Sequence, residues 1–431
     1  MTGSNSRAEA LPLEADPVAS GAPAGTTGWA VSQLLRRVIV RGDLKVHGLS
    51  GSEAPEAFGD GRGPSATIRL TAEAARRIAA DPELGVGECY MDGSLIVEDG
   101  CVRDLLEIIF LNPESQTYVQ ERIGALGLGV IRKLHRKNSR KAARTNVAHH
   151  YDLSRELYEL FLDPDLQYSC AYYARPGMSL EAAQRAKKTH IIAKLLLEPG
   201  QTVLDIGCGW GGMARQIAET EPVQVTGVTL SPEQLAVARE RALPGTHFAL
   251  QDYRDVKAQF DRVVSVGMFE HVGLTSYDEY FATIARVLRD DGVALIHSIG
   301  RKDGPSVNNP WIEKYIFPGG YIPSLSEVLP AIEKAGLWVT DIEILRLHYA
   351  ETLKDWNDRF QSRRDAAAAL YDERFCRMWE FYLAASEMSF RHHGHMVFQI
   401  QLAKRVDTVP LTRDYITETE RARSGLRSLA A

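Results

Sequence analysis

The sequence lacks any apolar run close to the roughly 18 residues that a membrane-spanning helix needs. Its start, MTGSNSRAEALPLEADPVASGAPAG, also lacks the positive charge and apolar stretch of a secretory signal, and carries acidic residues instead. These two absences exclude a spanning or secreted protein of the usual kind. We therefore expect a cytoplasmic protein that is associated only peripherally with the inner face of the membrane.

Cysteine is also scarce, and the net charge is negative. The five cysteines are odd in number and contain no C-x-x-C pair, which argues against a disulfide framework and against a metal site. The net charge of −6 argues against a nucleic-acid partner, because such proteins carry a basic footprint. With 431 residues, of which 45% are hydrophobic, the chain is long enough for two or three domains with sizeable cores.

Composition and periodicity divide the first part of the chain. Residues 1–27 are rich in Ala, Gly, Pro and Ser and predict a flexible tail. Residues 28–111 predict a small α+β domain. It opens on VIVRGDLKVHG, which predicts a strand, a turn near Gly42 and a second strand. Helices are expected from Thr71 to about Pro82 and over Val102 to Phe110.

A basic segment connects this domain to the rest of the chain. Within residues 112–147, the stretch from Arg132 to Arg144 holds seven Lys and Arg and no acidic residue. One interpretation is a solvated linker face, as most basic runs are. The other is a patch that adsorbs to an anionic membrane surface, with about 1 kcal/mol from each basic side chain. The segment alone favours neither.

Residues 148–405 change to an alternating pattern. A helical stretch, LSRELYELFL, and a long amphipathic helix ending before Pro199 precede strands that alternate with helices from TVLDI to GVALIHSI. This alternation predicts an α/β domain with a largely parallel sheet. Residues 406–431 are expected to form a C-terminal tail. No internal repeat is present.

A glycine-rich turn marks the first strand of this domain. TVLDI runs into Gly207-Cys-Gly209-Trp-Gly-Gly212 and then into a helix, so backbone amides can approach a ligand. The pattern alone would equally suit a dinucleotide. However, Asp205 stands just before the turn, and the next strand, VTGVTLS, lacks the acidic residue that would hold an NAD ribose. Four glycines in six residues make a turn that serves packing alone a poor explanation.

Several segments together resemble one family. VLDIGCGWGGMA, GVTLSPEQ, LQDYRD, VSVGMFEHVG, HSIG and YIFPGGYIPS occur in this order between about His149 and Lys404. They resemble cyclopropane-fatty-acyl-phospholipid synthases and the related mycolic-acid methyltransferases, and GECYMDGS resembles GEAYMDG of the longer bacterial enzymes. The resemblance implies a Rossmann-like class I methyltransferase domain with a helical lid, preceded by a small α+β lipid-engaging domain.

The resemblance also implies the cofactor, S-adenosyl-L-methionine, and the residues around it. Its amino-acid end would meet Asp205 and the glycine turn, its ribose the end of the next strand, and its adenine the segment after that. The residues carried over by matching motifs are Tyr168, Ser169, Asp205, Gly207, Gly209, Thr229, Leu230, Gln234, Asp252 and Tyr253.

An alkene is a feeble nucleophile, so its methylation needs a potent electrophile, and closing a cyclopropane ring from the resulting cation needs a base. Such a site should be dry and aromatic-walled. The resemblance implies a bicarbonate ion as that base, held by Cys170, Glu270, His297, Ile299 and Tyr349. Taken singly, each of these residues would more often serve packing or helix capping. Their joint occurrence inside the family motifs favours the catalytic interpretation.

The expected function is therefore transfer of a methylene unit from S-adenosylmethionine to the double bond of an unsaturated phospholipid in a bilayer. A related enzyme that makes a methylene- or methyl-branched chain is the alternative, and the residues do not separate the two. The resemblance also suggests a homodimer. A lipid-binding protein without catalysis, or a small-molecule methyltransferase, fits less well, because both sites are retained and the basic linker needs a purpose.

Two further features receive no role in the chemistry. Many family members have a cysteine before an A-F-R segment, where this chain has Ser386 before EMSFR, with Cys376 ten residues earlier. Neither is assigned as a nucleophile, because the chemistry needs no covalent enzyme intermediate. His392, His393 and His395 lack a nearby cysteine or acidic cage, and we interpret them as a solvated turn rather than a metal cluster.

Overall fold

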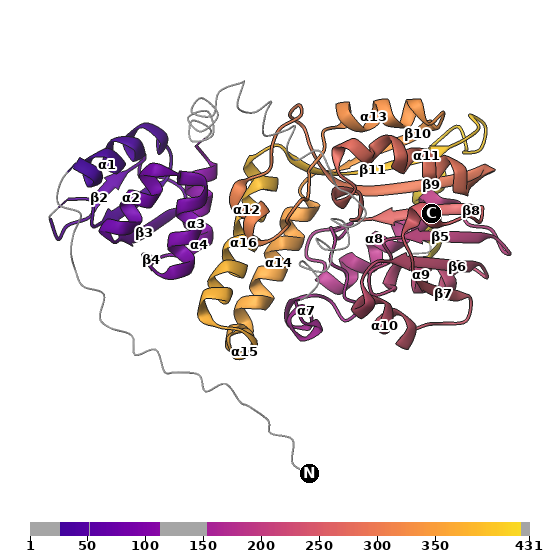
Figure 1. The fold of residues 1–431 in the computed structure, drawn as a ribbon, viewed down its shortest axis with the longest axis horizontal. Helices are drawn as coiled ribbons and strands as arrows, with labels where there is room; N and C mark the ends of the chain where they lie inside the picture. Colours follow the sequence, from indigo (N-terminus) through magenta and orange to yellow (C-terminus); the bar gives the residue numbers. More distant parts are fainter. Residues whose placement is uncertain (1–25, 51, 113–152, 424–431) are drawn as a thin grey trace, which may run out of the picture.

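The computed structural model describes residues 26–50, 52–112 and 153–423 and divides into a small and a large α/β unit (Figure 1). The expected tail up to residue 25 and the basic stretch from Arg132 to Arg144 lie outside the described residues. Among the helices that are described, none combines the length and the apolar character needed to cross a bilayer.

The small unit is a four-stranded sheet, in the order β2-β1-β3-β4, packed with four helices. Its elements are α1 (Thr26–Val38), β1 (Asp43–His47), β2 (Glu56–Phe58), β3 (Ser65–Leu70), α2 (Ala72–Ala80), α3 (Pro82–Asp92), β4 (Leu95–Asp99) and α4 (Val102–Phe110). The expected helix after Thr71 is confirmed, because the Thr71 hydroxyl accepts a hydrogen bond from the Ala74 amide, at 3.1 Å, and caps α2. The helix over Val102 to Phe110 is confirmed as α4.

The first expected strand of the small unit is wrong. Helix α1 runs to Val38, so the VIV segment begins as the end of a helix rather than as a strand, and the first strand is β1. The helix also begins two residues before the domain boundary that we expected at residue 28. Val31, Leu34, Leu35 and Val38 recur at helical spacing, and both valines are buried, so the apolar period of α1 outweighs the short alternation that follows it.

The large unit is built on a seven-stranded sheet in the order β10-β11-β9-β8-β5-β6-β7. β11 runs antiparallel to both of its neighbours, and the strands from β9 to β7 are parallel. The strands are β5 (Thr202–Ile206), β6 (Gln224–Thr229), β7 (Thr246–Leu250), β8 (Phe260–Val266), β9 (Leu288–Arg301), β10 (Trp338–Leu345) and β11 (His395–Ala403). The expected alternation of strands and helices is thereby confirmed.

Helices cover both faces of this sheet. They are α7 (Arg155–Phe161), α8 (Leu180–Leu195), α9 (Gly212–Thr220), α10 (Pro232–Glu240), α11 (Tyr277–Val287), α12 (Pro310–Tyr315), α13 (Leu325–Lys334), α14 (His348–Ser362), α15 (Arg364–Leu370), α16 (Glu373–His392) and α17 (Asp414–Arg423). Along β5, Val203 packs in the core with α8 and α9, whereas Leu204 packs in the core with α11 and α13. Burial on both faces is what a parallel sheet requires.

Helices α12, α14 and α16 lie between the small unit and the sheet (Figure 1). α16 packs against both α3 and α4. The fully buried carboxylate of Glu387 on α16 receives two hydrogen bonds from the Arg103 guanidinium of α4, each 2.9 Å long. Tyr90 on α3 donates to Glu380 at 2.8 Å. The small unit is therefore anchored on the helical layer that the family resemblance describes as a lid.

Helix α8 differs from the amphipathic helix that we expected. Eleven of its 16 residues are buried, and they include charged side chains on Lys187, Lys188 and Lys194 together with His190. The sheet and α17 both cover this helix, and Tyr415 of α17 also contacts Gln401 of β11. Buried charges must be paired or hydrogen-bonded, and each of these four side chains has a hydrogen-bonding partner.

The expected C-terminal tail contains helix α17, which is held by polar contacts to His190, Gln401 and Glu221. Glu420 accepts from His190 Nδ1 at 2.6 Å, while His190 Nε2 lies 2.7 Å from Glu343 on β10. Burial lowers the pKa of His190, but the hydrogen bonds to Glu343 and Glu420 outweigh it and raise the pKa above 6.5. His190 therefore bridges two carboxylates that favour its charged form.

This bridge makes the docking of α17 pH-dependent. A histidine pKa that is raised on folding stabilises the fold below the unfolded pKa, and the contribution disappears as pH rises through the folded value. We expect His190→Gln to lower the free energy of unfolding by about 1–3 kcal/mol at about pH 6 and by much less at about pH 9. Thermal unfolding at both pH values measures this, with the exposed His247→Gln as control. Equal losses at both pH values would contradict a charged His190.

Candidate active site

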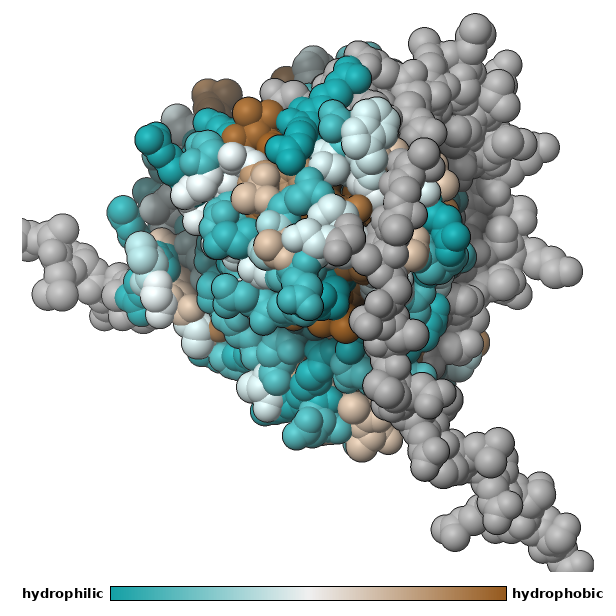
Figure 2. Space-filling model, turned by 90° about the vertical axis from the view of Figure 1, so that its left-hand side faces the viewer, coloured by the Kyte–Doolittle hydropathy of each residue, from teal (hydrophilic) through white to brown (hydrophobic). Residues whose placement is uncertain are grey.

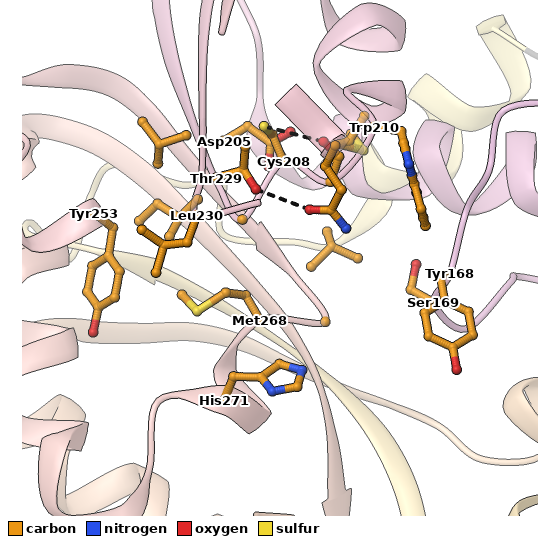
Figure 3. A pocket seen from close by; sticks show the side chains of 18 of the residues that line it. Tyr168, Ser169, Asp205, Cys208, Trp210, Thr229, Leu230, Tyr253, Met268 and His271 are labelled. Carbon is orange, nitrogen blue, oxygen red and sulfur yellow. Dashed lines mark hydrogen bonds between the residues drawn. The ribbon is translucent and has the colours of Figure 1, made fainter. Parts of the chain in front are cut away.

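One pocket lies beyond the carboxyl ends of β5, β6 and β8, where the strand order reverses on either side of β5. Figure 3 shows Tyr253, Leu230 and Met268 toward one end of it, and Tyr168 and Ser169 toward the other. The structure brings all ten residues expected around the cofactor into the lining of this pocket. They are Tyr168, Ser169, Asp205, Gly207, Gly209, Thr229, Leu230, Gln234, Asp252 and Tyr253.

The glycine turn forms the floor of the pocket between β5 and α9. Gly207 has φ of 78°, and a Cβ there would lie 2.7 Å from Met268 Cγ, so a side chain is excluded by both conformation and contact. Gly209 has φ of 54°, and a Cβ there would meet no atom within 4 Å. A side chain at Gly209 would instead project into open space beside the pocket. The glycines therefore keep the backbone accessible to a ligand.

Asp205 is the most informative side chain of the pocket. It is buried, and its Oδ2 has no hydrogen-bond partner in the protein. Burial raises the pKa of Asp205 to about 7, although the charge of Lys187 opposes the rise. A buried carboxyl without a partner is unfavourable unless a ligand completes it. The ammonium group of S-adenosylmethionine has the charge and the donors that Asp205 requires, so this residue fits the cofactor.

Ser169 is oriented by a buried lysine that the sequence reasoning missed. Lys187 Nζ donates to Ser169 Oγ at 2.8 Å and to Gln167 Oε1 at 2.7 Å. An ammonium group only donates, so the Ser169 oxygen accepts and its own proton remains available to a second acceptor. Burial lowers the pKa of Lys187 to about 8. The spacing of apolar residues along α8 does not predict that Lys187 orients Ser169.

The end of β6 offers no acidic residue at the other end of the pocket, where an NAD site would have one. The Thr229 hydroxyl donates to Gln234 Oε1 at 3.1 Å, so the end of β6 offers neutral hydrogen-bonding groups (Figure 3). The Asp252 carboxylate is held by Arg254, with a 2.6 Å contact to Nη2, and is neutralised there. The Tyr253 ring stacks edge-on against Tyr280 with centroids 5.5 Å apart.

The lining also includes residues that the sequence reasoning did not assign. They are Leu166, Gln167, Ile206, Cys208, Trp210, Met213, Val228, Gln251, Arg254, Val266, Gly267, Met268, His271 and Val272. Burial lowers the pKa of His271 to about 4, which leaves it neutral at physiological pH. Met268 and His271 stand, together with Glu270, in the segment VSVGMFEHVG that carried the resemblance, and this was the available signal.

The five expected catalytic residues lie outside this lining, and the structure joins two of them directly. Glu270, in a short 3-10 helix (Phe269–His271), accepts a hydrogen bond from the Ile299 amide at 2.6 Å. Its second oxygen, Oε2, is buried without a partner in the protein, and burial raises the pKa of Glu270 to about 7. This carboxyl can therefore exchange a proton near neutral pH.

The other three expected catalytic residues come from different elements. Cys170 is fully buried, its thiol donates to the Ala171 carbonyl at 3.3 Å, and burial raises its pKa. His297 on β9 is buried, with Nδ1 3.1 Å from Gln399 Nε2. Tyr349 on α14 is buried against Trp356 and Phe390. The charge of Lys187 influences the pKa of Cys170, Asp205 and His297, although burial is the larger cause for each.

Ser386 and Cys376 both lie on α16, outside the pocket lining. Cys376 is buried, and burial raises its pKa, so its thiol is unreactive. Ser386 is half-buried. The interpretation that gave neither residue a nucleophilic role is consistent with these positions.

The three histidines do not form the solvated turn that we expected. His392 ends α16 and lies 3.5 Å from Glu107 of α4, His393 stacks on Phe110 at 4.2 Å, and His395 begins β11. Burial lowers the pKa of His393 to about 4 and that of His395 to about 3. They pack where α16 meets the small unit, because α4 covers a segment that looks exposed in sequence.

The strand order, the glycine turn and the pocket at the switch point define a class I S-adenosylmethionine-dependent methyltransferase. Comparison with known proteins specifies the family. Residues 138–400 match the model of mycolic acid cyclopropane synthetases, and the chain belongs to this family.

Curated relatives extend the match beyond the catalytic unit. The chain is 40% identical over 341 residues to cyclopropane-fatty-acyl-phospholipid synthase of Escherichia coli K12, which covers 77% of this chain and 86% of the relative. It is 36% identical over 439 residues to tuberculostearic acid methyltransferase UfaA1 of Mycobacterium tuberculosis, which covers 94% of this chain and 99% of the relative. The small unit is therefore part of the similarity.

Solved structures agree with these relatives. The cyclopropane synthase MmaA2 of M. tuberculosis superposes with a TM-score of 0.58 at 35% identity, over 61% of this chain and 98% of that one. Mycolic acid cyclopropane synthase CmaA1, solved with S-adenosylhomocysteine, gives a TM-score of 0.57 at 35% identity, over 60% and 97%. The protein is an S-adenosylmethionine-dependent methyltransferase of the cyclopropane synthase type.

Proposed function

We propose that the protein transfers a methylene unit from S-adenosylmethionine to the double bond of an unsaturated phospholipid acyl chain and forms a cyclopropane ring. The observation that carries this proposal is Glu270. It is a carboxyl with one oxygen on the Ile299 amide and the other buried without a partner in the protein, and its pKa is about 7. A site in which a carbocation loses a proton needs a group that can hold or pass on that proton near neutral pH.

Different residues of the pocket would bind different parts of the cofactor. Asp205 would bind the ammonium group, and Ser169, oriented by Lys187, would donate its proton to the carboxylate. Thr229 and Gln234 would bind the ribose, and Tyr253 with Leu230 would pack on the adenine. Bound there, S-adenosylmethionine supplies an electrophilic methyl group. Uncharged contacts at the ribose are compatible with this cofactor, because its net positive charge resides at the other end.

We further propose that a bicarbonate ion binds among Cys170, Glu270, His297, Ile299 and Tyr349 and acts as the base. Glu270 fits such an ion in its protonated form, because its unpartnered Oε2 could then donate a hydrogen bond to the anion. The Ile299 amide already donates to Glu270, so an ion would either share this amide or rely on the side-chain donors. The fully buried Cys170 and the buried His297 and Tyr349 keep the region dry, which protects a cation from water.

The product of the reaction tests the proposal. Purified protein with S-adenosylmethionine and vesicles of monounsaturated phospholipid is expected to add one CH2 unit to each modified acyl chain, as measured by mass spectrometry. Proton NMR of the extracted lipid should then contain the upfield signals of a cyclopropane. The same acyl chain offered as a free fatty acid tests whether the phospholipid is required. No mass gain with any monounsaturated lipid would contradict the proposal.

A methylene- or methyl-branched product is the second candidate. It is favoured by the relative that matches 94% of this chain, which is a tuberculostearic acid methyltransferase. A ring and an exocyclic methylene have the same mass, because they are isomers. Vinylidene signals in the NMR spectrum, in place of upfield cyclopropane signals, would decide for this candidate.

We propose that the basic segment from Arg132 to Arg144 brings the protein to an anionic membrane surface. Figure 2, which faces the small unit, shows a largely hydrophilic surface with only scattered hydrophobic residues among those that are described. Exposed large hydrophobic side chains of this unit are Trp29, Val40 and Ile96. A surface of this composition supports adsorption through charge more than insertion of a broad apolar patch.

Neutralising the seven Lys and Arg between Arg132 and Arg144 should therefore weaken binding to anionic vesicles. With about 1 kcal/mol per basic side chain near the surface, a loss of at least about tenfold in affinity at low salt is expected. Sedimentation with vesicles at increasing salt measures it, and vesicles of zwitterionic lipid are the control. Binding that is insensitive to salt and to the substitutions would contradict this role.

A further inference from the structure

On the face of the sheet that α8 covers, buried polar side chains replace apolar packing on β9 and β11, near the β10 edge. Along β9, Leu295 packs with α8 and α9, and His297 follows it on the same face. Beside His297 stands Gln399, its direct partner across the β9–β11 pair, and both side chains are buried. Lys194 of α8 reaches Gln399 from above the sheet with its own side chain fully buried.

The hydrogen-bond directions in this group can be deduced from one donor. Lys194 Nζ lies 2.8 Å from Gln399, and an ammonium group has no acceptor, so the Gln399 atom that faces it is the amide oxygen. The amide nitrogen of Gln399 therefore faces His297 Nδ1, at 3.1 Å, and can only donate to it. A neutral imidazole that accepts at Nδ1 carries its single proton on Nε2.

The charges around the group hold it in this arrangement. Lys194 contacts the Glu343 carboxylate of β10. Although burial favours the acid form, hydrogen bonds from His190 and Lys194 hold the pKa of Glu343 well below its usual range. Glu343 therefore remains an anion and stabilises the ammonium form of Lys194. Burial, together with the charges of Lys187 and Lys194, lowers the pKa of His297 well below 6.5, so its imidazole is neutral.

We propose that Gln399, oriented by Lys194, is a positioning residue that fixes His297 in the Nε2–H tautomer. The imidazole then presents a hydrogen-bond donor, rather than a lone pair, to an anion in the catalytic region. This inference rests on the proposed function in one respect, namely that His297 belongs to the site that binds the base. The tautomer itself is a property of the protein without any ligand.

Nitrogen-15 NMR of histidine-labelled protein tests the tautomer directly. The His297 signals are identified by their loss in His297→Gln, and we expect a protonated Nε2 and an unprotonated Nδ1 in the wild-type protein. In Gln399→Glu, a carboxylate faces Nδ1 and can only accept, so the proton should move to Nδ1. A wild-type His297 that already carries its proton on Nδ1 would overturn the inference without any variant.

Gln401→Glu is the matched control. Gln401 stands two residues further along β11, is equally buried, and contacts the Lys194 carbonyl and Tyr415 instead of His297. The same isosteric change there should leave the His297 tautomer unaltered. If both variants moved the proton equally, the direct contact with Gln399 would not be the cause, and the inference would be wrong.

Kinetics connect the tautomer to the reaction. Gln399→Glu is expected to lower kcat about 10–100-fold, the range for residues that orient a functional histidine, and to leave the KM for S-adenosylmethionine unchanged. A reversed tautomer with an unchanged kcat would refute the positioning role. An Nε2–H tautomer in a wild-type protein that yields no modified lipid would instead refute the proposed function, so the two failures are distinguishable.

Discussion

Glu270→Gln is expected to lower kcat by about two to four orders of magnitude, the range associated with loss of a positioned proton-transfer group. The amide keeps the shape of the side chain and can still accept the hydrogen bond from the Ile299 amide. It cannot take up or release a proton at the position of Oε2. Because Glu270 lies outside the lining of the cofactor pocket, the KM for S-adenosylmethionine should change little. Release of S-adenosylhomocysteine at saturating lipid measures both parameters.

The same variant should be more stable than the wild-type protein at alkaline pH. A carboxyl whose pKa is raised on folding, here from 4.5 to about 7, makes the fold less stable as pH rises between these two values. Removing the group should therefore raise the free energy of unfolding by roughly 3 kcal/mol above pH 7 and have little effect below about pH 4.5. The exposed Glu333→Gln is the control. Loss of activity together with loss of stability at all pH values would indicate damage to the fold instead.

Asp205→Asn is expected to weaken binding of S-adenosylmethionine and S-adenosylhomocysteine about 10–100-fold. A hydrogen bond between charged groups contributes about 1.5–3 kcal/mol, and Asp205 Oδ2 has no competing partner in the protein. Isothermal titration calorimetry measures the affinity directly. The unliganded variant should also be more stable than the wild type above about pH 7, because burial raises the pKa of Asp205 to about 7 and the asparagine removes an ionisable group.

A matched substitution separates this effect from general damage to the sheet. Asp261 accepts hydrogen bonds from the backbone and the side chain of Thr202, at the opposite end of β5 from the glycine turn. Its pKa is lowered in spite of burial, because these hydrogen bonds favour the anion. Asp261→Asn should therefore reduce stability at neutral pH and leave ligand affinity unchanged. An Asp205→Asn variant that behaved like Asp261→Asn would contradict a ligand role for Asp205.

Substitution of a ligand-binding carboxyl is expected to raise stability and to lower function. Asp205 is buried and Glu270 is half-buried, and each has one buried oxygen without a protein partner and a pKa raised to about 7. Asp205 lines the cofactor pocket, while Glu270 lies beyond its lining on the Ile299 side. Together they mark two adjacent places where this chain requires something bound.

Features that depend on neighbouring residues were predictable from the sequence. Thr71 caps α2 because its side chain reaches an amide three residues on, and Gly207 and Gly209 adopt positive φ because a tight turn must follow β5. The alternation of strands and helices follows from apolar periodicity within each segment. The ten cofactor residues line one pocket because the carboxyl ends of parallel strands meet at one edge of the sheet.

Features that depend on distant residues were decided only by the tertiary structure. The charged residues of α8 look like a solvent-facing surface in sequence, but the packed structure buries them, and one partner of His190 is Glu420, 230 residues away. His297 meets Gln399 across 102 residues because β11 returns antiparallel beside β9. Local periodicity specifies which elements form and which turn can bind a ligand. Burial and pairing of the side chains that tune the catalytic region arise only when those elements pack together.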